Sequence, residues 1–78
     1  MIEKKLSDLK PGQKGTVVRI KSYGSLRRRI IDMGITPNAV IIMKKEAPFG
    51  DPIEINIRGY ELSIRKSEAN QIIVLVEE

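Results

Sequence analysis

Residues 47–69 read APFGDPIEINIRGYELSIRKSEA, and this stretch decides the fold. It opens with a loop rich in proline and glycine. Isoleucine then occupies every second position of Ile53–Ile57, and apolar residues alternate with polar ones again through Tyr60–Ile64. An alternation of period two is typical of strands that bury one face, and Gly59 lies where a tight turn must join them. The stretch therefore predicts an antiparallel hairpin, with Tyr60 on its core-facing side.

The rest of the chain contains further short strands and turns. Runs rich in β-branched and apolar residues predict strands at residues 15–20, 39–45 and 71–76, with the end of another strand near residue 5. Pro11-Gly12 predicts a type II turn, and residues 67–70 predict one helical turn. The continuous apolar run Val40–Met43 suggests a strand that is buried on both faces.

One true helix is expected, at Ser25–Met33. Its first residue is a serine, which can cap a helix, and Leu26, Ile30 and Met33 form one apolar stripe. Gly34 follows where a left-handed residue commonly ends a helix. Five to six short strands with one short α-helix predict a mainly β protein, a small closed SH3-like barrel. An OB-type barrel is the alternative.

The composition limits the possible functions. The chain has 78 residues, of which 14 are basic and 10 acidic, which gives a net charge of +4. This length predicts a single domain over residues 1–78. The absence of cysteine and histidine excludes disulfides and removes the commonest transition-metal ligand and general base. Neither a signal peptide nor a membrane-spanning run is present, so we expect a soluble, cytoplasmic protein.

Carboxylates are the remaining candidates for chemistry. Glu54 and Glu61 lie on the two strands of the predicted hairpin and could face each other, but like charges directly opposite are destabilising. The same two glutamates, with Asp32 and Asp51, are the candidate metal ligands. Ferrous iron in proteins commonly takes imidazole together with carboxylate, and this chain has no imidazole. We therefore expect no enzyme activity, no cofactor and no dedicated metal site.

Three consecutive arginines, Arg27–Arg29, are the sharpest electrostatic feature. Successive helical residues point about 100° apart, so the three cannot form one patch. Three interpretations stay open: a solvated helix face on which Arg28 pairs with Asp32, a protein-docking surface, or a contact with RNA or DNA. Phe49, at the tip of the proline- and glycine-rich loop, is expected either to be exposed for docking or to plug the end of the barrel.

Three motifs in this order resemble the FeoA family. They are Leu6–Gly12 with Gly15 and Val17, then Leu26–Pro37, and then residues 47–69. The resemblance covers nearly the whole chain and implies an SH3-like barrel. Asn38 stands where the family usually has glycine, and asparagine is the residue that best replaces glycine in a left-handed turn.

The resemblance also implies a partner. FeoA proteins are regarded as cytoplasmic accessory or regulatory proteins of ferrous iron uptake that bind the cytoplasmic, GTPase-containing part of the membrane transporter FeoB. From their positions alone, the residues expected to dock are Tyr23, Leu26, Arg27, Arg29, Phe49 and Asp51. The protein would meet the membrane only through FeoB and bind no nucleic acid, and a homo-oligomer stays open. The alternative is a small-barrel nucleic-acid-binding protein.

Overall fold

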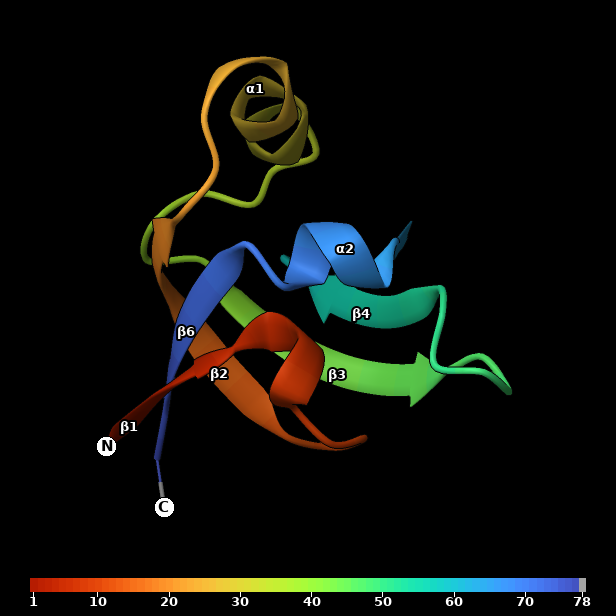
Figure 1. Cartoon of the computed structure of the whole chain (residues 1–78). Coiled ribbons are helices and arrows are strands. Elements are labelled where there is room, and N and C mark those ends of the chain that lie inside the picture. Colours follow the sequence, from red (N-terminus) through yellow and green to blue (C-terminus); the bar gives the residue numbers. More distant parts are fainter. Residues whose placement is uncertain (78) are drawn as a thin grey trace.

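The computed structural model describes residues 1–77, shown in Figure 1. Its strands are β1 (Ile2–Lys5), β2 (Lys14–Ile20), β3 (Val40–Glu46), β4 (Ile53–Ile57), β5 (Tyr60–Ile64) and β6 (Ile72–Val76). Its helices are the 3-10 turn η1 (Leu6–Asp8), α1 (Gly24–Asp32) and the short α2 (Lys66–Ala69). The predicted hairpin strands have the expected bounds, and the other predicted strands and helices are shifted by one residue. None of the helices in this range is long and apolar enough to cross a membrane.

The six strands form one antiparallel sheet in the order β1-β6-β2-β3-β4-β5, which curls around a single core (Figure 1). Irregular pairing between Val17 and Arg19 and between Met43 and Lys45 accompanies this curl, because a bulge increases local twist. The predicted mainly β barrel with one helix is confirmed. In the strand order, β1 and β5 stand at the two ends of the sheet.

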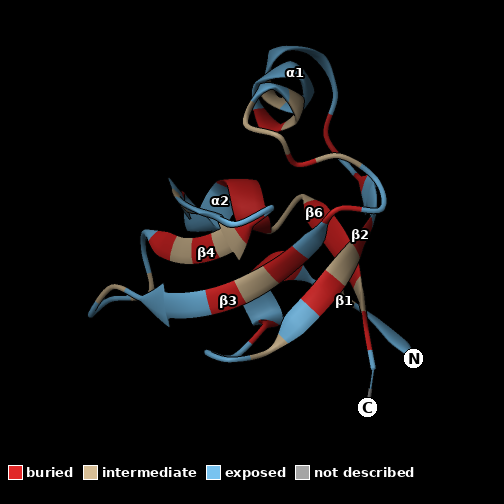
Figure 2. Ribbon diagram, turned by 180° about the vertical axis from the view of Figure 1, so that it is seen from behind, coloured by how far each residue is buried: buried red, intermediate tan, exposed pale blue. Residues whose placement is uncertain are grey.

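The inner face of the sheet forms the core. All three isoleucines of β4 are 0% exposed, and they pack with buried residues from β2, β3 and β6 and from the helices. Figure 2 shows buried residues alternating with intermediate ones along β4, and buried residues at every second position in the first part of β3. Each such aliphatic side chain contributes roughly 1.5–3 kcal/mol when fully buried. The period-two pattern in the sequence therefore located the core correctly.

The expectation that β3 is buried on both faces was wrong. Ile41 and Met43 are fully buried, whereas Val40 is 47% exposed and Ile42 is half-buried. The alternation has a simple cause: Ile41 and Met43 face the core, and the other two lie on the outer face of the sheet. A continuous apolar run therefore marks here a strand with one buried face and one partly exposed apolar face.

The two ends of α1 differ in how well the sequence predicted them. The helix begins at Gly24, which has a φ of +63°, so Ser25 lies inside the helix and no side chain caps the start. The expected serine cap was therefore wrong. At the other end Gly34 has a φ of +92°, the Gly34 N–H donates to the Ile31 carbonyl (2.9 Å), and the Ile35 N–H donates to the Ile30 carbonyl (3.3 Å). These two bonds make the predicted left-handed helix end a Schellman motif.

The alternation had suggested that Tyr60 is a core residue, and this was wrong. Tyr60 is 44% exposed, and its hydroxyl donates to the Met33 carbonyl at the end of α1 (2.8 Å). A Cβ atom on Gly34 would lie 2.5 Å from that hydroxyl, so the absence of a side chain makes the contact possible. Nearby, Arg58 Nη2 donates to Thr36 Oγ1 (2.9 Å). The β4–β5 hairpin thus holds the segment that follows α1.

The remaining turns follow the sequence closely. Arg58 and Gly59 have φ of +51° and +84°, the signs that the type I′ turn of a two-residue hairpin needs. Asn38 has a φ of +76°, so asparagine adopts the left-handed conformation expected of it. Gly12, with a φ of +91°, completes the predicted turn, in which the Gln13 N–H donates to the Lys10 carbonyl (2.9 Å).

Candidate partner-binding surfaces

The helix α1 stands at the edge of the barrel and is held there by its apolar side. Ile30 is 0% exposed, and Leu26, Ile31 and Met33 pack against the core while remaining partly exposed. Figure 1 shows α1 beyond α2 and the upper ends of the strands, with most of its surface turned away from the sheet. The predicted apolar stripe therefore attaches the helix, and its other faces are available to solvent or a partner.

Two of the three arginines also attach α1. Arg27 Nη1 donates to the Ile20 carbonyl at the end of β2 (3.2 Å), and Arg29 Nε lies 3.1 Å from Glu68 Oε2 on α2. Each arginine thus connects the helix to a different part of the barrel. Both were predicted as docking residues, but their guanidinium groups already have partners within the chain.

Glu68 is the buried carboxylate that the sequence did not reveal. Its side chain is 5% exposed, whereas that of Arg29 is 63% exposed. Glu68 Oε1 accepts a hydrogen bond from the Arg65 N–H (2.9 Å), which caps the start of α2. Within residues 1–77 the buried Oε2 accepts no hydrogen bond, so its contact with Arg29 is a charge–charge contact. The sequence predicted a helical turn here, but neither the Glu68 cap nor the contact with Arg29.

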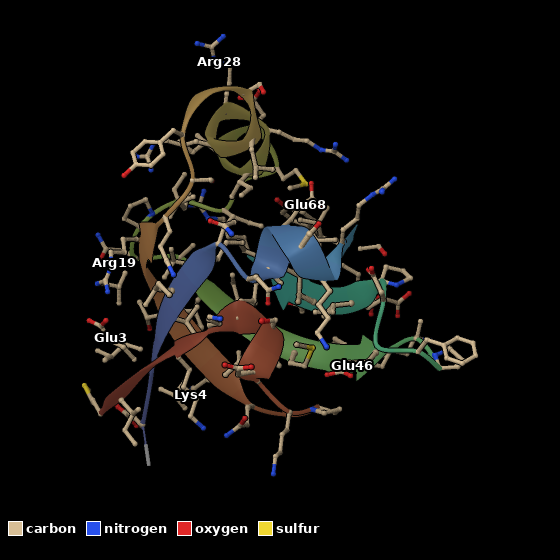
Figure 3. The ribbon with its side chains drawn as sticks, viewed as in Figure 1. Glu3, Lys4, Arg19, Arg28, Glu46 and Glu68 are labelled. Carbon is tan, nitrogen blue, oxygen red and sulfur yellow. The ribbon has the colours of Figure 1, made fainter. Side chains whose placement is uncertain are left out.

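Arg28 and Tyr23 are the uncommitted residues of this helix surface. Figure 3 shows Arg28 on the outer side of α1, pointing away from the barrel. No ion pair or hydrogen bond within residues 1–77 involves its side chain, so the pair with Asp32 that helical spacing allows is not formed. Tyr23, just before the helix, is 88% exposed. Tyr23 was predicted to dock, whereas Arg28 was not.

The second predicted surface is the loop tip, residues 47–52, between β3 and β4. Phe49 is 98% exposed, so the expected exposure is confirmed and the barrel-plug interpretation was wrong. The loop is nevertheless ordered by local bonds: the Gly50 N–H donates to the Ala47 carbonyl (2.7 Å), and the Ala47 N–H donates to the Pro52 carbonyl (3.0 Å). A large aromatic side chain is therefore presented to solvent on a fixed turn.

Asp51 supports this loop rather than extending its exposed tip. Its Oδ1 accepts a hydrogen bond from the backbone N–H of Lys66 (3.0 Å), the first residue of α2. This acceptor therefore serves an element that lies further along the chain. The free N–H groups at a helix start favour such an acceptor. Asp51 thus holds the loop of Phe49 against α2.

The six predicted docking residues therefore form two surfaces. Tyr23, Leu26, Arg27 and Arg29 belong to α1 and its approach, and Phe49 and Asp51 belong to the loop tip. Figure 1 shows α1 at the top of the molecule and the β3–β4 loop at its right edge, well separated. A single partner would have to contact both surfaces across the barrel to use all six residues.

The two glutamates of the β4–β5 hairpin are not brought face to face. Glu54 pairs in register with Ser63 and Glu61 with Asn56, so the two glutamates are not opposite each other. Glu54 Oε2 instead lies 3.4 Å from Lys45 Nζ. Across residues 1–77, no group of three or more aspartate, glutamate, histidine or cysteine side chains could hold a metal ion. The paired-carboxylate hypothesis was therefore wrong.

Comparison with known families agrees with this barrel, its single helix and its motif order. The family model described as the FeoA domain matches residues 4–76. The chain belongs to the FeoA family. Its structure is similar to that of the FeoA-like protein from Clostridium acetobutylicum, with 40% sequence identity, 100% of this chain and 91% of that chain covered, and a TM-score of 0.91.

Two further proteins are similar to this FeoA chain. The crystal structure of FeoA from Stenotrophomonas maltophilia in complex with zinc, described as an SH3 domain protein, has a TM-score of 0.77 over 95% of this chain and 89% of that chain. At 20% identity it supports the SH3-like fold alone. The Fe(2+) transport protein A/Fe(2+) transporter FeoB fusion protein of Porphyromonas gingivalis is 34% identical over 70 residues. That match covers 90% of this chain but 8% of the fusion protein.

Proposed function

We propose that this FeoA chain is a non-enzymatic, cytoplasmic accessory protein of ferrous iron uptake that binds the cytoplasmic, GTPase-containing part of FeoB. The observation that carries the proposal is the fusion protein, in which a similar domain is covalently joined to an FeoB transporter. Domains that are fused in one protein commonly act together when they are separate chains.

The distribution of charge supports an acidic contact surface on the partner. Residues 9–32, which include β2 and α1, carry seven basic residues and one acidic one, a charge of +6. The rest of the chain carries seven basic and nine acidic residues, a charge of −2, so the net charge is +4. Complementary charge speeds encounter and orients the partner. We therefore expect α1 to face an acidic region of FeoB.

The exposed residues divide the docking surface by role. Tyr23, Arg28 and Phe49 are uncommitted, and aromatic and arginine side chains are the ones that most often dominate binding energy. Leu26, Arg27, Arg29 and Asp51 contact other parts of this chain and hold those three in place. Removing the first group should reduce FeoB binding, whereas removing the second should reduce stability first.

The test is the affinity of purified variants for detergent-solubilised FeoB from the same source. Truncating a hot-spot side chain costs about 1–2 kcal/mol or more, so Tyr23→Ala with Phe49→Ala should weaken binding by at least about tenfold. Glu61→Gln, an exposed residue on β5, is the matched control and should bind as the unmodified protein does. If the double variant binds FeoB with unchanged affinity, these two surfaces are not the docking site.

A further inference from the structure

A shallow groove of about 460 Å³ lies on the outer face of the barrel where the two chain ends meet. Figure 1 shows both ends at the lower left of the molecule, far from α1 and from the β3–β4 loop. The residues that line it include Met1, Lys14, Thr16, Val40, Leu75 and Glu77. We call it the terminal groove. None of the six residues predicted to dock lies in it.

Strand register builds the terminal groove. Thr16 of β2 is paired with Val40 of β3 on one side and with Leu75 of β6 on the other. Directly paired residues project from the same face of a sheet, so these three side chains form one row across three strands. The neighbouring Val17 is 1% exposed and faces the core. The row is therefore on the outer face, with the barrel core directly behind it.

The groove exposes apolar side chains of the described residues. Val40 is 47% and Met1 77% exposed. Contiguous exposed apolar surface on a small protein commonly marks an interaction site. Lys14 on one side and Glu77 on the other supply charged groups at the rim. The chemistry fits a short peptide segment with apolar side chains and an acidic residue that reaches Lys14.

The fusion protein indicates which segment could reach the groove. The match covers 8% of the fusion protein, so most of that protein is joined to one end or the other of its FeoA-like region. Met1 and Glu77 both line the groove, so a chain that leaves from either end begins there. In the fusion protein, a short flexible connection would raise the effective concentration of such a segment to the millimolar range, so weak apolar contacts would hold it there.

We infer that the terminal groove is a second docking site for FeoB. It binds the segment of FeoB that lies next to the junction in the fusion protein. The apolar side chains of that segment lie on Val40 and Leu75, and an acidic residue of it faces Lys14. This inference rests on the proposed function. It adds a tethering contact on the opposite part of the barrel from α1 and leaves Tyr23 and Phe49 free for the GTPase-containing part.

Photo-crosslinking tests this inference. The chain contains no native cysteine, so one introduced cysteine can be labelled specifically. Thr16→Cys, labelled with a benzophenone maleimide, is mixed with detergent-solubilised FeoB and irradiated, and mass spectrometry locates the crosslinked peptide. Asp8→Cys, an exposed residue on η1 outside the groove, carries the same label as the control. We expect one FeoB segment to be captured from position 16 and no specific capture from position 8.

An affinity measurement complements the crosslink. Val40→Glu places a charge in the apolar row and should weaken binding to FeoB by about five- to tenfold, as expected for loss of one buried interface residue. If the unmodified protein binds FeoB, but Val40→Glu binds equally well and position 16 captures no segment, the groove inference is overturned and the proposed function stands. If the unmodified protein does not bind FeoB at all, both are overturned.

Discussion

At the scale of single residues, two glycines are required for different reasons. Gly15 lies in a regular strand, but a Cβ atom there would come within 2.8 Å of Val74 Cγ2 and 2.9 Å of Val74 Cβ. Gly34 combines a positive φ with the close approach of the Tyr60 hydroxyl. The first requirement is purely one of packing and could not be read from the sequence. The requirement at Gly34 was predicted in part, because the sequence predicted the left-handed helix end but placed the tyrosine in the core.

Gly15→Ala should lower the free energy of unfolding by about 1–3 kcal/mol, the usual cost of forcing an extra group into a packed core. Val74 is 0% exposed and a branched side chain, so it cannot move aside easily. Urea denaturation followed by circular dichroism measures the change. Ser63→Ala, an exposed change on β5, serves as the control and should stay within about 0.5 kcal/mol. Equal stability of Gly15→Ala and the unmodified protein would mean that β2 and β6 are further apart than described.

Gly34→Ala should cost more than about 1 kcal/mol, since an alanine resists a φ of +92° and its Cβ meets the Tyr60 hydroxyl. Tyr60→Phe removes that hydroxyl and its bond to Met33, at a cost of about 0.5–1.5 kcal/mol. The double variant should be more stable than the two separate costs predict, because the clash has gone. Strict additivity in this cycle would contradict the proposed contact.

At the scale of elements, α1 is attached to the barrel by a few specific contacts. Ile30 anchors it in the core, Arg27 ties it to β2, and Arg29 ties it to α2 through Glu68. The sequence predicted the helix, its apolar stripe and its glycine end, because these depend on residues within one or two turns. It did not predict the Arg29–Glu68 contact or the outer exposure of Val40, because both depend on how distant strands are ordered in the sheet.

The Arg29–Glu68 contact can be measured by a double-mutant cycle with Arg29→Gln and Glu68→Gln. Because Arg29 is 63% exposed, solvent screens the pair, and we expect a favourable coupling of about 0.5–1 kcal/mol. Glutamine can keep the hydrogen bond that Glu68 Oε1 accepts from the Arg65 N–H, so the cycle isolates the charge contact. Thermal unfolding at two salt concentrations provides a check, since the coupling should shrink at high salt. A coupling of zero at low salt would contradict this description of how α1 is held.

At the scale of the whole molecule, the barrel has three separate surfaces, which we propose to contact one large partner. The helix surface is basic, the loop tip is aromatic, and the terminal groove is apolar and adjoins both chain ends. Sequence patterns identified the family and the first two surfaces. The groove could not be predicted, because it arises from the pairing of Thr16 with Val40 and Leu75, which lie far apart in the chain.

The most direct test of the central proposal is to recover the tagged protein from detergent-solubilised membranes and cytoplasm of iron-limited source cells. The eluate is analysed for protein identity by mass spectrometry and for nucleic-acid absorbance. We predict recovery of FeoB with little nucleic acid, and loss of FeoB from the eluate of the Tyr23→Ala, Phe49→Ala variant. Recovery of nucleic acid without FeoB would contradict the proposal and would make Arg28 and its neighbours on α1 the surface to examine for phosphate contact.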